Sequence, residues 1–213
     1  MFHVKHSDIE QVPETAKAVF GDRYELAVRY ADLLARDSET LGLLGPRELD
    51  KLWSRHILNS AVVAELIAKH EKVADIGSGA GLPGIPVAIV NPENQVTLVE
   101  PMERRSDWLK NVAMELSLDN VRVFRARGEE LDPQFDVVVA RAVAALPKLI
   151  RFSVPSLLPG GRLLALKGAK AEEEIEDARK LVKKFKIESF EVVYAGKDSL
   201  QEPTKLVEVK VQS

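Results

Sequence analysis

The chain has 213 residues, of which 46% are hydrophobic and 30% are charged, a balance typical of one folded domain with at most a small appendage. The absence of cysteine excludes disulfides, cysteine-ligated zinc, iron–sulfur clusters and thiol nucleophiles. No apolar run approaches the ~18 residues of a membrane span, and residues 1–8 lack the apolar core of a signal peptide. We therefore expect a cytoplasmic protein with no membrane partner.

The formal net charge of −3 conceals an uneven distribution of charge along the chain. Residues 1–70 carry 9 Lys and Arg against 11 Asp and Glu, and residues 71–140 carry 7 against 12. Residues 141–213 carry 14 against 10, a local charge of +4. Two interpretations stay open for this last third: a basic surface for a polyanion, or simply a solvated helix face.

The first seventy residues are predicted to form helices. Residues 24–37 carry apolar side chains at the spacing of an amphipathic helix. These side chains are Leu26, Ala27, Tyr30, Leu33 and Leu34. Gly45-Pro46 then breaks the chain, and Pro46 suits the first turn of a new helix. Apolar residues between 47 and 69 predict one or two further helices, so that residues 1–70 form an N-terminal helical cap.

The remainder of the chain alternates between short apolar runs and helical stretches. Strands are predicted at residues 72–76, 95–100, 121–124, 136–140 and 162–167, with helices at 104–116 and 146–157 among them. This alternation indicates a parallel sheet that is covered on both faces. Two further strands, at residues 188–194 and 205–211, have no helix between them. We expect this pair to be antiparallel at one edge of the sheet.

The most informative stretch is residues 73–84 (VADIGSGAGLPG), where four glycines follow a predicted strand. A phosphate loop is excluded, because no Lys-Ser or Lys-Thr follows the glycines. The dinucleotide pattern GxGxxG fails as well, since Leu82 stands where its third glycine belongs. The pattern that fits is D-x-G-x-G-x-G, beginning at Asp75.

That pattern resembles the first motif of class I S-adenosylmethionine-dependent methyltransferases, in which the loop passes beneath the methionine part of the cofactor. In that family an acid at the end of the next strand binds the ribose. Glu100 stands at this point, 23 residues after Gly77. A carboxylate suits a vicinal diol because it offers two acceptor oxygens. A structural turn with an unrelated surface acid is the alternative, and it does not explain both features together.

Further stretches resemble the bacterial 16S rRNA (guanine-N7) methyltransferases, the ribosomal small-subunit methyltransferase G family, also called glucose-inhibited division protein B. The matching stretches are residues 53–60 (WSRHILNS), 75–84, Glu100 with Arg104-Arg105, 126–130 (ARGEE), 140–144 (ARAVA), Gly160-Gly161 and 166–168 (LKG). Their order and spacing match the family from about residue 25 to about residue 170. One departure is Gly128, where the family commonly has alanine.

The resemblance implies a class I S-adenosylmethionine methyltransferase fold: a seven-stranded, mostly parallel Rossmann-like sheet with an antiparallel edge hairpin, over residues 71–213. It also implies S-adenosyl-L-methionine as cofactor and no metal. The cofactor-binding residues are expected to be Gly77, Gly79, Leu82, Glu100, Gly128, Glu129 and Arg141, and the catalytic residues Arg141 and Lys167.

Several of these residues also have a purely structural interpretation. Arg141 could form an ion pair with Asp75 or Asp136, and Lys167 could simply end a strand. In residues 53–60, Arg55 and His56 either pack the helical cap against the sheet or, for His56, contact RNA. The sequence leaves these alternatives open.

The sequence restricts which atom of a base this protein could methylate. Methylation of cytosine C5 needs a cysteine nucleophile, and the chain has none. Methylation of an exocyclic amine commonly uses an Asn/Asp-Pro-Pro-Tyr/Phe motif after the fourth strand, where residues 140–143 read Ala-Arg-Ala-Val. Guanine N7 has an in-plane lone pair and no proton to lose, so a pocket with Arg141 and Lys167 but no obvious base suits it.

The expected partner is therefore 16S ribosomal RNA or the small ribosomal subunit, bound by a protein that we expect to be monomeric. Arg104-Arg105 and the basic last third are the candidates for phosphate contacts. One alternative is a small-molecule methyltransferase with the helical cap as a lid. A second alternative is a non-catalytic ribosome-binding module that retains a vestigial cofactor fold.

Overall fold

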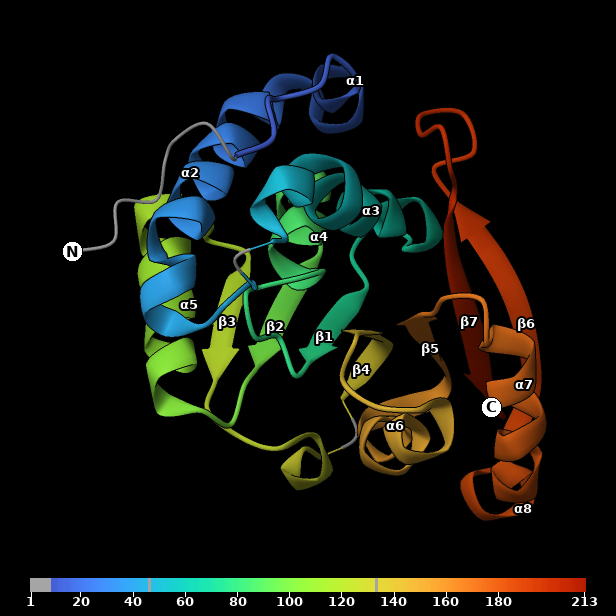
Figure 1. Cartoon of the computed structure of the whole chain (residues 1–213). Coiled ribbons are helices and arrows are strands. Elements are labelled where there is room, and N and C mark those ends of the chain that lie inside the picture. Colours follow the sequence, from blue (N-terminus) through green and yellow to red (C-terminus); the bar gives the residue numbers. More distant parts are fainter. Residues whose placement is uncertain (1–8, 46, 133) are drawn as a thin grey trace.

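The computed structural model describes residues 9–45, 47–132 and 134–213, so the expectations for residues 1–8 and for Pro46 lie outside the described residues. Its centre is a seven-stranded sheet in the order β3-β2-β1-β4-β5-β7-β6 (Figure 1). The strands are β1 Lys72–Ile76, β2 Gln95–Val99, β3 Val121–Phe124, β4 Phe135–Arg141, β5 Leu157–Leu166, β6 Ile187–Ala195 and β7 Thr204–Val211. The first five strands are parallel, and β7 pairs antiparallel with β5 and β6.

All seven predicted strands are present, and β5 differs most from its predicted bounds. It begins at Leu157, five residues before the predicted start at Arg162. Its first residues include Gly160-Gly161, with Gly160 at φ 76°, and the register with β4 shifts between Phe135 and Val137. This irregular segment belongs to the strand and forms a bulge in it. The sequence Pro-Gly-Gly is typical of a loop, which explains why the strand was predicted to begin later.

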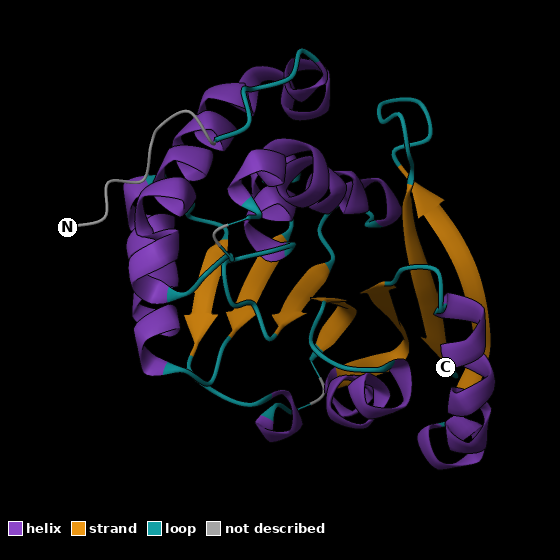
Figure 2. Ribbon diagram, in the orientation of Figure 1, coloured by secondary structure: helices purple, strands orange, loops and turns teal. Residues whose placement is uncertain are grey.

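Helices cover both faces of the sheet (Figure 2). The first face carries α1 Thr15–Phe20, η2 Gly21–Arg23, α2 Tyr24–Leu41, α3 Leu58–Ala61, α4 Gly84–Val90 and α5 Glu103–Glu115, and the second carries η6 Gly128–Glu130, α6 Leu146–Ser153, η7 Val154–Ser156, α7 Ala171–Ala178, η8 Arg179–Leu181 and α8 Val182–Phe185. Alternate residues of β4 supply the two cores. Val137 and Val139 face the first core, while Val138 and Ala140 face the second. Burial on both faces explains why these strands are almost entirely apolar.

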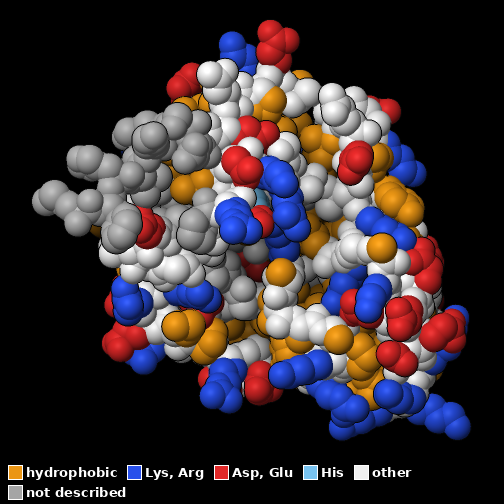
Figure 3. Space-filling model, in the orientation of Figure 1, with side chains coloured by type: hydrophobic (Ala, Val, Ile, Leu, Met, Phe, Trp, Pro, Cys, Tyr) orange, Lys and Arg blue, Asp and Glu red, His pale blue; other side chains and the backbone are white. Residues whose placement is uncertain are grey.

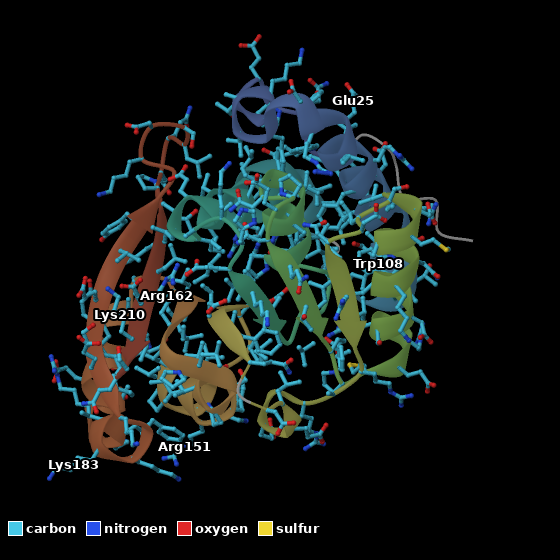
Figure 4. All side chains as sticks on the ribbon, turned by 180° about the vertical axis from the view of Figure 1, so that it is seen from behind. Glu25, Trp108, Arg151, Arg162, Lys183 and Lys210 are labelled. Atoms are coloured by element: carbon cyan, nitrogen blue, oxygen red, sulfur yellow. The ribbon has the colours of Figure 1, made fainter. Side chains whose placement is uncertain are left out.

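The helices that precede residue 70 share one apolar core with the sheet. Tyr30 and Leu34 of α2 are completely buried in the same cluster as Val73 and Val96. Trp108 of α5, labelled in Figure 4, donates from Nε1 to Oδ2 of Asp37 at 2.9 Å and so joins α5 to α2. The division into a cap of residues 1–70 and a domain of residues 71–213 stays a prediction.

Residues 49–66 are helical as predicted, but they do not form a regular α-helix. The run consists of η3 Leu49–Lys51, the π-helix η4 Leu52–Ile57, α3 and the 3-10 helix η5 Val62–Leu66. The Glu10 carboxylate accepts the backbone N–H groups of Trp53 and Ser54 at 2.8 and 2.9 Å. A residue 43 positions away thus stabilises the first turn of η4. Among the described helices, none has the length and apolar character needed to cross a bilayer.

Candidate cofactor and acceptor site

The loop between β1 and α4 turns sharply at the carboxyl edge of the sheet. Gly77 and Gly79 adopt left-handed conformations, with φ of 71° and 53°, which side chains other than glycine rarely adopt. The backbone N–H of Gly77 donates to the carbonyl of Val99 at 2.8 Å. Ser78 adds two bonds: its Oγ donates to the carbonyl of Asp75 and accepts the N–H of Val99. The loop is thereby tied to both β1 and β2.

Glu100, which follows β2, lies directly against this loop. Its side chain is 3% exposed. Oε2 accepts the backbone N–H of Gly79 at 2.9 Å, and Oε1 accepts that of Met102 at 2.8 Å. Each carboxylate oxygen keeps a second lone pair. Glu100 can therefore accept further hydrogen bonds from a diol at this edge without leaving its present position.

Asp75 is the completely buried acid at the end of β1. Its Oδ2 accepts the N–H of Gly84 at 3.0 Å, whereas its Oδ1 is buried without a hydrogen-bond partner. Burial raises the pKa of this carboxyl from 3.8 to about 7, against the opposing effects of the Gly84 N–H and of Ser78. An unpaired buried acceptor beside the glycine loop fits a ligand that carries an amino group, as S-adenosylmethionine does.

The residues predicted to bind the adenine and methionine parts reach the same edge from different elements. Gly128 opens η6 and is buried: a Cβ there would lie 2.6 Å from the carbonyl oxygen of Phe152 and 2.9 Å from Cγ2 of Ile76 at the end of β1. The alanine common in the family would therefore require this chain to shift. Glu129 is exposed. Leu82 turns its side chain into the first core, and its backbone N–H donates to the carbonyl of Ser78 at 3.2 Å, so its carbonyl is the backbone group left for a ligand.

Arg141 ends β4, and the structure joins it to the helical run η3–η5. Its Nη1 donates to the carbonyl of His56 at 3.2 Å and to Oγ of Ser60 at 3.3 Å, and its Nη2 contacts Nδ1 of His56. The alternative ion pair with Asp75 or Asp136 does not occur among the described residues. The guanidinium is thus held by neutral groups.

The segment after Arg141 is held in an unusual conformation. Ala142 has a φ of 54°, which costs an alanine about 1–2 kcal/mol. Val143 then covers the glycine loop, since a Cβ at Gly77 would lie 3.0 Å from it. A strained backbone beside a ligand loop indicates that this segment serves the site.

Lys167, which follows β5, anchors the end of that segment. Its Nζ donates to the carbonyl of Ala144 at 2.7 Å and pairs with Oε2 of Glu174 in α7 at 2.8 Å. The same oxygen accepts the N–H of Leu146 at 2.6 Å, at the first turn of α6. Lys167 therefore does more than end a strand, because it holds the segment between Arg141 and α6.

Two kinds of residue at the site were not predicted from the sequence. The hydroxyl of Tyr30 donates to the carbonyl of Ala80 at 2.6 Å, although the sequence indicated only that Tyr30 belongs to an apolar stripe. Met102 after β2, Phe124 at the last position of β3 and Val143 after β4 are 53%, 51% and 38% exposed. Exposed apolar side chains at the ends of three strands suit a ligand with an aromatic ring. The only signal in the sequence for any of these residues was that Tyr30 is a tyrosine within a stripe of aliphatic side chains.

We expect Tyr30→Phe to weaken cofactor binding without unfolding the protein. The change keeps the buried ring but leaves the carbonyl of Ala80 without its donor, which costs about 1–3 kcal/mol. Because that carbonyl lies inside the glycine loop, calorimetry should show lower affinity for S-adenosylmethionine. Tyr24→Phe, on the same helix, is the control and should bind as the wild type does. Unchanged affinity in Tyr30→Phe would contradict the assigned role.

The basic residues are partly engaged within the protein. Arg104 and Arg105 donate to the carbonyls of Thr40 and Gly42, and so cap the end of α2. The face in Figure 3 shows Lys and Arg near its centre and along its lower edge, where Figure 1 places α8. Arg151 and Lys183 lie at the same lower end in Figure 4. Both cations lack an ion-pair partner among the described residues.

The strand order, the glycine loop after β1 and the acid after β2 define a class I S-adenosylmethionine-dependent methyltransferase. Solved structures share this fold. The TYW2 protein of M. jannaschii in complex with AdoMet matches with a TM-score of 0.60 at 22% identity, covering 74% of this chain and 76% of that one. A putative S-adenosyl-L-methionine-dependent methyltransferase of Methanococcus maripaludis matches with a TM-score of 0.59 at 16% identity, covering 86% and 92%.

Sequence relatives narrow the class to one family. The family model described as GidB, rRNA small subunit methyltransferase G, matches residues 23–202. The Ribosomal RNA small subunit methyltransferase G of Mycolicibacterium smegmatis is 48% identical over 212 residues, which cover 97% of this chain and 90% of that protein. The protein of that name from Streptomyces coelicolor is 45% identical, covering 96% and 87%. This chain belongs to the rRNA small subunit methyltransferase G family.

Proposed function

We propose that this protein transfers a methyl group from S-adenosylmethionine to N7 of a guanine in the 16S ribosomal RNA of the small subunit. The observation that carries the proposal is the match to relatives named Ribosomal RNA small subunit methyltransferase G over 97% of this chain. The geometry of the site supports N7 as the acceptor atom.

The glycine loop and the strand ends would hold the cofactor. The backbone of Gly77, Gly79 and Leu82 would contact the methionine part, and Glu100 would accept the ribose hydroxyls. Gly128 and Glu129, which follow β3, would contact the adenine edge. When bound, the cofactor supplies a methyl group on a sulfonium for an in-line displacement, to which positioning and electrostatics contribute most.

Arg141 and Lys167 would serve the acceptor base. Guanine N7 reacts through its lone pair and needs no general base. The buried imidazole next to Arg141 agrees with this, because both nitrogens of His56 are already in contact with Arg141 and Glu48. Arg141 would donate to guanine O6, a familiar contact for arginine. Lys167 would act by holding the segment that carries Arg141 and Val143.

The RNA would approach this edge of the sheet as an opened or looped segment. In an A-form helix the narrow major groove hides N7 from side chains, so the target guanine must lie outside regular helix. Arg151 and Lys183 lie near the opposite ends of the parallel strands, because α6 and α8 run back from the site, so these cations would contact phosphates only of RNA that extends beyond the site. Arg104-Arg105 would add to this only from their exposed sides. We propose that the protein works in the cytoplasm as a monomer.

Mass spectrometry of ribosomal RNA from cells with and without this gene tests the proposal. We expect one 7-methylguanosine of 16S RNA to disappear when the gene is absent and to return with a plasmid copy. The purified protein should also methylate small-subunit particles isolated from the deletion strain. Turnover on a metabolite extract with none on particles would instead support the small-molecule alternative. A protein that binds no S-adenosylmethionine would support the vestigial module.

A further inference from the structure

His56 contacts Arg141, and the role inferred for it here rests on the proposed function. This imidazole lies in the π-helix η4 and is 5% exposed. Its Nε2 lies 2.7 Å from Oε2 of Glu48, and its Nδ1 contacts Nη2 of Arg141. Both ring nitrogens are therefore committed to charged side chains, one on each side of the ring.

The two contacts determine where the single proton of the ring lies. A guanidinium N–H can only donate, so the Nδ1 facing Arg141 must be an acceptor without a proton. The proton of a neutral imidazole is then on Nε2, from which it is donated to the carboxylate of Glu48. Glu48 thus selects the tautomer that presents a lone pair to Arg141.

We propose that His56 is a positioning residue for Arg141, and that Glu48 holds it in the neutral, Nε2-protonated form that directs the guanidinium toward the acceptor base. The backbone carbonyl of His56 and Oγ of Ser60 accept hydrogen bonds from the other terminal guanidinium nitrogen, Nη1. Three acceptors from one helical run therefore surround Arg141. Displacing a catalytic group by about 1 Å can cost up to about a hundredfold in rate.

The charges around the imidazole favour its neutral form. Burial lowers the pKa of His56 below 6.5, and the charge of Arg141 on β4 lowers it further. Arg55, on the same helix, acts in the same direction, whereas Glu48 opposes them. Burial lowers the pKa of Arg141, as does the charge of Arg55, whereas Tyr30, Glu48 and Asp75 oppose this effect. Protonated His56 would turn an N–H toward Arg141 and repel it, so acid should release the guanidinium.

Glu48→Gln is the first test, since glutamine keeps an acceptor but removes the charge that raises the pKa of His56. The methylation rate on small-subunit particles should fall at acid pH in the wild type. In Glu48→Gln this fall should move to lower pH. The measure is the difference between the two profiles, because Asp75 titrates in both proteins. Glu65→Gln is the control: its carboxylate binds the N–H of Gly196 at 2.8 Å, and its profile should match the wild type.

Nitrogen NMR of the full chain gives a readout that is independent of activity. The chain has four histidines, and the His56→Asn spectrum assigns the His56 signals. We expect an unprotonated Nδ1 at neutral pH, a lower pKa of His56 in Glu48→Gln and a higher one in Arg141→Ala. A proton on Nδ1, or a pKa that neither variant changes, would overturn the proposal. Wild-type inactivity on particles would overturn the proposed function and leave this coupling intact.

His56→Ala separates positioning from binding. The rate kcat should drop by about ten- to a hundredfold while the affinity for S-adenosylmethionine stays near that of the wild type. An equal loss of cofactor affinity would assign His56 a structural role instead. A melting temperature measured alongside reports whether the fold survives.

Discussion

Arg141→Ala should lower kcat for methylation of small-subunit particles by about a hundredfold or more and leave the fold intact. The reason is that the substitution removes the guanidinium that the structure holds at the end of β4, beside the end of β1 where the glycine loop begins. Losing a preorganised donor at a reacting centre typically costs about 10²–10³ in rate. The vacated acceptors, Nδ1 of His56 and Oγ of Ser60, would cost about 1–3 kcal/mol of stability.

Three measurements on purified protein check this expectation: single-turnover methylation, calorimetry with S-adenosylmethionine and thermal melting. Arg141→Lys keeps the charge but loses the planar fork, so it should recover only part of the rate. Arg36→Ala removes an exposed arginine that pairs with its neighbour Asp37 at 2.8 Å, and it should act as the wild type does. Normal methylation by Arg141→Ala would contradict the catalytic assignment.

Asp75→Asn should change stability and cofactor binding in opposite directions. The pKa of Asp75 is about 7 in the folded protein and 3.8 for an ordinary aspartate, so the folded state holds the proton more tightly. Its contribution to stability is then complete below about pH 3.8 and is lost as the pH rises through about 7. The whole change amounts to about 4 kcal/mol. At pH 8 the wild type carries a buried charge that asparagine avoids.

Urea unfolding at about pH 5 and about pH 8 measures this effect. The wild type should lose stability between the two values, and Asp75→Asn should lose less and be the more stable protein at pH 8. Calorimetry should show at least about a tenfold loss of affinity for S-adenosylmethionine, because the unpaired anionic oxygen is gone. Asp107→Asn, on the exposed side of α5, is the control. Full cofactor affinity in Asp75→Asn would refute the proposed contact.

Contacts within the protein limit the phosphate-binding role that the sequence predicted for Arg104-Arg105. Arg104-Arg105 were predicted to contact phosphate, and the structure directs both guanidinium groups to the carbonyls of Thr40 and Gly42. These carbonyl groups belong to the end of α2, and Gly42 lies 63 residues before Arg105 in the chain. The charge of a side chain is readable from the sequence, but its partner depends on which elements pack beside it. Phosphate contact by this pair stays a prediction.

The sequence alone determined those features that depend on residues close together in the chain. Short runs rich in valine and other apolar residues predicted β1 and β3 with their observed bounds. The glycine loop and Glu100 could be predicted because parallel strands bring their carboxyl ends to one edge. The family resemblance was also available from short local stretches.

Only the tertiary structure decided how the functional side chains are held. Arg141 and His56 are 85 positions apart, and Tyr30 and Ala80 are 50 apart. Their contacts arise because the helices that precede residue 70 pack into the core of the sheet, and no local spacing encodes that packing. The sequence therefore predicted Arg141 as a site residue. The fold decided that its partners are neutral acceptors of one helical run and not the carboxylates of Asp75 or Asp136.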